Sequence, residues 1–147
     1  MAPSAAWRGL LVGGSSDGLG SILRVNETFD LGNTRLRVVL ADPVATVLEG
    51  ELDPGGGTTW HTHHREDEIV VVLEGKLVVD DGERHELGPG DAYALPRGVR
   101  HAFANESESL TRLTFFCSPG GLERFFRDLT SGVPPAEAAL RADLVFE

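Results

Sequence analysis

Length, composition and charge exclude several classes of protein. The chain has 147 residues, 41% of them hydrophobic, so it has the size of one globular domain and can bury a core. Its 23 acidic and 13 basic residues give a formal charge of −10, which disfavours binding to nucleic acid and to anionic membranes.

Residues 1–33 of the chain carry the weakest signals. Met1–Leu11 contains one arginine and no long apolar stretch, so it does not read as a signal peptide. Residues 1–33 are expected to form an arm with an edge strand.

The single cysteine, Cys117, follows two phenylalanines and is interpreted as a buried apolar side chain. A chain that cannot form an intrachain disulfide fits a reducing compartment, and we expect a cytoplasmic protein.

Short extended segments fill residues 34–118. They are rich in valine, leucine, threonine and phenylalanine and are separated by glycine and proline, which predicts many short strands. The predicted strands are Arg35–Leu40, Ala45–Leu52, Glu68–Leu73, Lys76–Val79, Arg84–Leu87, Ala92–Leu95, Arg100–Ala104 and Leu110–Cys117. Short strands without intervening helices indicate an all-β antiparallel barrel or sandwich.

Residues 119–147 have a different, helical pattern. Ser118 and Pro119 suit an N-cap and the first residue of a helix. Four apolar side chains then recur at helical spacing: Leu122, Phe125, Phe126 and Leu129. A second short helix is expected over Pro134–Asp143. We expect both helices to pack on the outside of the barrel.

Histidines gather in one part of the predicted barrel. His61 and His63 are two residues apart, so in a strand both imidazoles point to one face, whereas His64 points to the other. A carboxylate a few residues later and His101 from another strand can join the same point. Imidazole and carboxylate together are ligands for Fe(II), Mn, Co, Ni or Zn.

The spacing of these residues follows two ordered patterns. Five residues separate Gly55 from His61, four separate His63 from Glu68, and six separate Glu68 from Gly75. A second pattern runs through Gly90, Pro96, Gly98, His101 and Asn105. Together they resemble the two signature motifs of the cupin superfamily, and the C-terminal part is similar to small quercetin-dioxygenase-like cupins.

The resemblance implies a fold, a ligand set and an assembly. The fold is a jelly-roll β-barrel over residues 34–118 with a short C-terminal helical segment, and small cupins usually form homodimers. The metal ligands are His61, His63, Glu68 and His101, around one divalent ion. Glu66 and Asp67 are rival carboxylates, although a solvated acidic turn is the simpler interpretation of each.

A metal with open coordination positions favours an enzyme over a structural site. The first hypothesis is a dioxygenase-type oxidoreductase that acts on a small aromatic or polyphenolic compound, with Glu68 as a base. Tyr93 and Phe103 are candidates for the pocket lining, although core packing explains each equally well. Two alternatives stay open: a non-redox cupin such as a polyketide cyclase, isomerase or lyase, and a cupin that binds a small molecule without turnover.

Overall fold

A computed structural model describes residues 25–147, so residues 1–24 of the predicted arm lie outside the described part of the chain. The eight predicted strands are confirmed, each to within one residue at either end. They are β2 (Thr34–Ala41), β3 (Thr46–Leu52), β5 (Asp67–Glu74), β6 (Leu77–Asp80), β7 (Arg84–Leu87), β8 (Ala92–Leu95), β9 (Arg100–Ala104) and β10 (Thr111–Ser118).

Three further strands have three residues each. β1 (Thr28–Asp30) is an edge strand that pairs with β2, and β4 (His61–His63) carries two of the predicted ligands. β11 (Leu144–Phe146) pairs with β4, so that Phe146 lies opposite His61. The prediction of helices alone after residue 118 was therefore wrong at the end of the chain, because a segment this short gains its strand conformation only from a distant partner.

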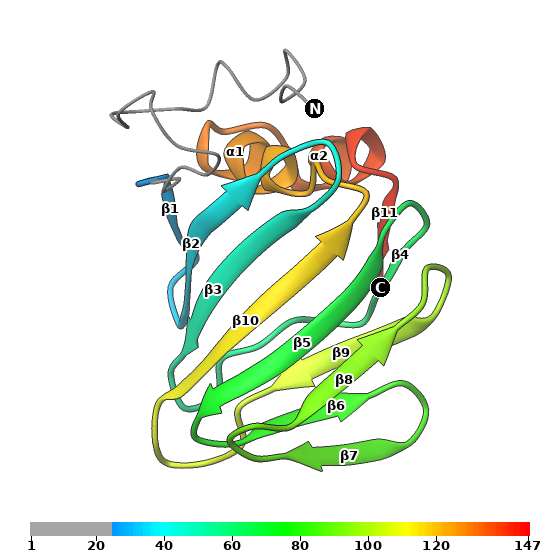
Figure 1. Cartoon of the computed structure of the whole chain (residues 1–147). Coiled ribbons are helices and arrows are strands. Elements are labelled where there is room, and N and C mark those ends of the chain that lie inside the picture. The colour runs from blue at the N-terminus through cyan, green and yellow to red at the C-terminus, as the bar shows by residue number, and fades with distance from the viewer. Residues whose placement is uncertain (1–24) are drawn as a thin grey trace, which may run out of the picture.

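The strands form two antiparallel sheets (Figure 1). One sheet has the order β1-β2-β3-β10-β5-β8, and the other has the order β11-β4-β9-β6-β7. Non-sequential neighbours such as β3 and β10 are typical of a jelly roll. The predicted all-β jelly-roll barrel is confirmed.

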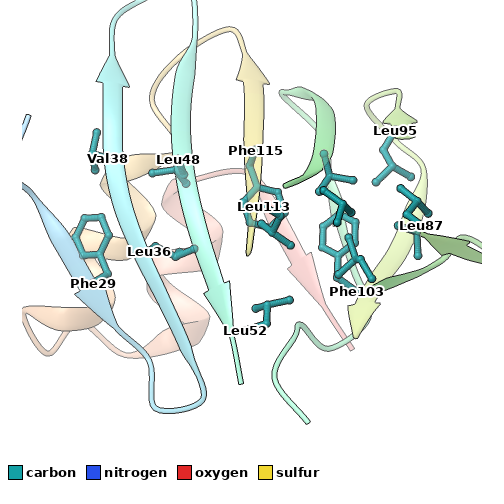
Figure 2. Close-up of a cluster of buried hydrophobic side chains, with 14 residues drawn as sticks. Phe29, Leu36, Val38, Leu48, Leu52, Leu87, Leu95, Phe103, Leu113 and Phe115 are labelled. Carbon is teal, nitrogen blue, oxygen red and sulfur yellow. The ribbon is translucent and has the colours of Figure 1, made fainter. Parts of the chain in front are cut away.

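Alternation along the strands produces the core between the sheets. In β3 every second residue is buried, from Thr46 to Leu52. Leu48, Leu113 and Phe103 belong to the resulting apolar cluster, which Figure 2 shows with Leu52 below and Phe103 towards the five-stranded sheet. Period-two burial of this kind fixes which side chains face the interior.

The two helices are α1 (Glu123–Thr130) and α2 (Pro135–Arg141). The predicted N-cap at Ser118 is wrong, because Ser118 still belongs to β10 and its hydroxyl donates to the carbonyl of Val44 at 2.7 Å. Residues 119–122 then cross tightly over the turn before β3. A Cβ atom on Gly120 would lie 1.7 Å from the carbonyl oxygen of Asp42, so only glycine allows this approach.

The helices lie together at one end of the sheets, beside the tips of β2 and β10 (Figure 1). Leu122 and Phe125 are buried in a second apolar cluster with Cys117, Ala138 and Leu144. The expectation that the helical stripe packs on the outside of the barrel needs correction. The stripe lines a cavity together with side chains of the barrel strands, such as Leu36 and Leu48.

Candidate metal centre

Three histidines and one glutamate converge inside the barrel. His61 and His63 are the ends of β4, His101 lies opposite His61 on β9, and Glu68 is the second residue of β5. All four side chains are buried, and one donor atom from each lies within 4.8 Å of the others. The ladder between β4 and β9 thus brings together residues that are 40 positions apart in the sequence.

The outer nitrogen of each imidazole is held in place. Nδ1 of His61 lies 2.9 Å from the carbonyl oxygen of Thr59, and Nδ1 of His101 lies 2.9 Å from that of Val99. A carbonyl only accepts, so both Nδ1 atoms carry the proton and each Nε2 is left as the metal-binding atom. Outer-shell bonds of this kind orient the imidazoles of metal sites.

Glu68 supplies the negative charge of the cluster. Its Oε2 lies 3.1 Å from Nε2 of His101 and 3.4 Å from Nε2 of His63. Burial raises the pKa of the Glu68 carboxyl, but the hydrogen bond from His101 and the charges of the surrounding histidines outweigh burial and hold this pKa below its ordinary value. The carboxylate is therefore ionised at neutral pH.

The histidines respond differently to the same surroundings. Burial, and then repulsion from His101, lowers the pKa of His61 to about 4, so this imidazole is neutral and ready to bind a cation. Burial also lowers the pKa of His101, but the hydrogen bond to Glu68 outweighs it and the net shift is upward. Buried imidazole nitrogens around an ionised carboxylate fit a divalent transition metal ion.

Glu66 has a role that the sequence interpretation missed. Its side chain is only 1% exposed, and its Oε2 lies 3.3 Å from Nδ1 of His63. The expected solvated turn is therefore wrong for this residue, because the turn after β4 folds Glu66 behind His63. Glu66 anchors His63 as the carbonyl groups anchor the other two histidines.

Asp67 and His64 lie outside the cluster. Asp67 is exposed and accepts hydrogen bonds from the side chain and the backbone N–H of Arg97, which lower its pKa to about 2. His64 follows the end of β4 and is exposed. Asp67 begins β5, where exposed and buried residues alternate, so its neighbour Glu68 is the buried carboxylate.

A cavity of about 210 Å³ opens beside the cluster. His61, His63 and Glu68 form part of its wall, and Phe103 lies next to them. Tyr93 does not line this cavity, because its hydroxyl donates to Asp81 at 2.7 Å at another part of the barrel.

The C-terminal segment contributes walls that the sequence analysis did not foresee: Leu122, Phe125, Phe126, Leu129, Leu144 and Phe146. The Phe146 ring stacks on the His61 ring with centroids 5.3 Å apart, and on Phe125 at 5.5 Å. The helical periodicity of residues 122–129 was visible in the sequence, but no local signal showed that the stripe faces the histidines.

Comparison with known proteins identifies the domain. Residues 47–117 match the family model of the cupin domain. The polyketide synthase CurC of Streptomyces cyaneus is 37% identical over 67 residues, which are 45% of this chain and 44% of that protein. Quercetin 2,3-dioxygenase of Bacillus subtilis is 32% identical over 103 residues, which cover 58% of this chain and 30% of that protein.

A solved structure agrees with these matches. The structure of KdgF from Halomonas sp. superposes with a TM-score of 0.62 and 26% identity, over 67% of this chain and 90% of that one. Residues 47–117 therefore match a cupin domain, as the two motifs predicted. The chain spans less than half the length of the two curated relatives named above. None of the helices among residues 25–147 has the length and apolar character that a membrane crossing requires.

Proposed function

We propose that the protein is a metal-dependent cupin enzyme, a dioxygenase-type oxidoreductase that acts on a small aromatic or polyphenolic compound. His61, His63, Glu68 and His101 would hold one divalent transition metal ion. The observation that carries the proposal is the apolar cavity that opens directly onto this buried cluster.

The donor set supports a catalytic role for the metal over a structural one. Four protein ligands leave positions for substrate on an ion that accepts five or six, whereas structural sites are closed. When bound, such an ion would supply Lewis acidity and, if redox-active, the means to activate dioxygen.

The residues around the cluster prepare the site for such a reaction. Phe146 covers one face of His61, and Phe103 lies 5.2 Å from the ring of His101. These apolar groups keep water away from the cluster, which strengthens electrostatic interactions there. Glu68 is the carboxylate of the cluster, and its Oε2 would accept a proton from an acidic hydroxyl of the substrate.

The chemistry of the cavity wall supports a neutral substrate. Among the described residues that line it, the ionisable side chains are His61, His63 and Glu68, all within the cluster. No arginine or lysine of the described chain lines the cavity, so away from the metal a phosphate group would find no cationic side chain. Phenylalanine and leucine dominate the wall, and they suit the faces of an aromatic ring.

A non-redox reaction is the second candidate. The matched relative whose name is polyketide synthase CurC supports it, because aromatic polyketides are also small, flat and oxygen-rich. In that case the metal would polarise a carbonyl and no oxygen would be consumed.

Oxygen consumption distinguishes the two candidates. Protein loaded anaerobically with Fe(II) is mixed with a panel of catechols and flavonols, with and without oxygen. The dioxygenase proposal predicts product formation with matched oxygen uptake, and the His101→Ala variant as control should show neither. Conversion without oxygen would favour the second candidate, and binding without conversion of any compound would contradict both.

A further inference from the structure

One buried polar atom in the cavity wall has no partner within the protein. Thr34 begins β2, is 7% exposed and lines the cavity. Among the buried side-chain nitrogen and oxygen atoms of residues 25–147, its Oγ1 alone lacks a hydrogen bond. Buried hydroxyl groups are nearly always paired, so this one needs an explanation.

The fold itself does not need the hydroxyl. The backbone carbonyl of Thr34 accepts a hydrogen bond from Leu31, and its backbone pairs with Leu52 in the ladder. Valine has the same shape and would fill the position in the strand without an unpaired oxygen. The neighbouring threonine in the wall differs, because Oγ1 of Thr58 accepts the backbone N–H of Phe103 at 3.0 Å.

Thr34 and three members of the metal cluster line the same cavity. The preceding residue, Asn33, touches Gly56, where an added Cβ would lie 2.4 Å from the Asn33 carbonyl oxygen. The wall of the cavity includes Thr34, Gly57 and Thr59 as well as His61, His63 and Glu68. A ligand that fills this cavity would therefore meet both Thr34 and the cluster.

The size of the cavity limits what such a ligand can be. An apolar cavity of about 150 Å³ is enough to hold benzene. The cavity of about 210 Å³ here therefore encloses one substituted ring or a small two-ring compound. A three-ring flavonol would extend beyond it, through the opening.

We infer that Thr34 is a specificity-determining residue. Its hydroxyl forms a hydrogen bond with a hydroxyl or carbonyl group at the end of the substrate that is remote from the metal-binding oxygens. The preferred substrate class is then a one- or two-ring aromatic compound with chelating oxygens at one end and a further oxygen function at the other. This inference rests on the proposed function, since the cluster must hold the chelating end.

A matched pair of probes tests this inference by binding alone. 4-(2-Hydroxyethyl)catechol and 4-propylcatechol have nearly the same shape and differ by a hydroxyl in place of a methyl group. Their affinities are measured by calorimetry without oxygen, on Zn(II)-loaded wild type, Thr34→Val and Thr34→Ser. Metal content and melting temperature are recorded for each protein.

The wild type should bind the hydroxyethyl compound about tenfold more tightly than the propyl compound, the usual effect of one hydrogen bond. Thr34→Val should lose this preference, bind the propyl compound at least as tightly as the wild type does, and keep its metal and its melting temperature. Thr34→Ser should keep the preference, because it keeps the hydroxyl.

Four results would overturn the inference, and they distinguish its failure from a failure of the proposed function. Equal affinities in the wild type, or an unchanged preference in Thr34→Val, would refute the role of Thr34 and leave the metal enzyme standing. A lower melting temperature of Thr34→Val with equal losses for both probes would show a structural role instead. Failure of the Zn(II)-loaded wild type to bind either catechol would refute both proposals. The predicted preference without oxygen-dependent turnover would support the inference and count against the dioxygenase.

Discussion

Glu66 offers the sharpest test of how the protein prepares its metal ligands. Its buried carboxylate lies 3.3 Å from Nδ1 of His63 and contacts no other ligand of the cluster within hydrogen-bond distance. Removal of such an outer-shell partner typically lowers metal affinity by about 10- to 100-fold, which is about 1.4 to 2.7 kcal/mol. Glu66→Gln keeps a hydrogen-bond acceptor but removes the charge, so its loss of metal affinity should lie at the low end of this range. Glu66→Leu leaves Nδ1 of His63 without a partner, so its loss of metal affinity should lie at the high end.

The assay is a competition titration of Zn(II) between the protein and a chelator of known affinity. Asp67→Asn is the matched control, because Asp67 is the next residue, is exposed and pairs with Arg97. We expect this control to bind Zn(II) like the wild type. The reasoning is refuted if Glu66→Gln and Glu66→Leu both match Asp67→Asn, since the contact with His63 would then have no effect on the metal.

Three further predictions concern protons, the carboxylate ligand and assembly. The pKa of His101 is raised in the metal-free protein, so below this pKa Zn(II) must displace a proton from the imidazole. The affinity for Zn(II) should then fall about tenfold for each pH unit below that pKa. Zn(II) titrations at pH 6, 7 and 8 that all gave the same affinity would contradict this. Glu68→Gln should weaken metal binding without abolishing it. If the carboxylate also acts as a base, turnover should fall by a further factor of about 10² to 10⁴. Equal losses of metal binding and turnover would argue against a role as a base. Exposed Ile69 and Phe116 lie opposite each other on β5 and β10, and we predict that they lie in a homodimer interface. By light scattering the wild type should then be a dimer and Phe116→Glu a monomer. A monomeric wild type would contradict this prediction.

Much of the barrel could be predicted from the sequence because its signals are local. The strands are short, rich in β-branched residues and ended by turns such as that at Gly75, which has a φ of +82° and where an added Cβ would meet the Leu110 carbonyl oxygen at 2.6 Å. The convergence of His61, His63 and Glu68 was also foreseeable, since alternation placed the two histidines on one face and the motif spacing pointed to Glu68.

The remaining features depend on contacts between distant segments. Phe146 lies against His61 only because β11 pairs with β4 across some eighty residues of sequence. A strand of three residues is too short to show a periodicity that would predict this pairing. Glu66 and Asp67 look alike in the sequence, but one turn buries the first behind His63 and leaves the second to Arg97. Tyr93 was a candidate for the pocket lining, but its hydroxyl donates to Asp81 away from the cavity.

Metal content is the most direct test of the central claim. Protein purified without chelator or affinity tag is analysed for Fe, Mn, Co, Ni and Zn, together with the alanine variants of His61, His63, His101 and His64. We expect about one transition metal ion per wild-type chain, loss of tight binding in the first three variants, and retention in His64→Ala, whose side chain is exposed and outside the cluster. A wild-type protein that holds no metal and binds none when it is added, or an equal loss in all four variants, would contradict it.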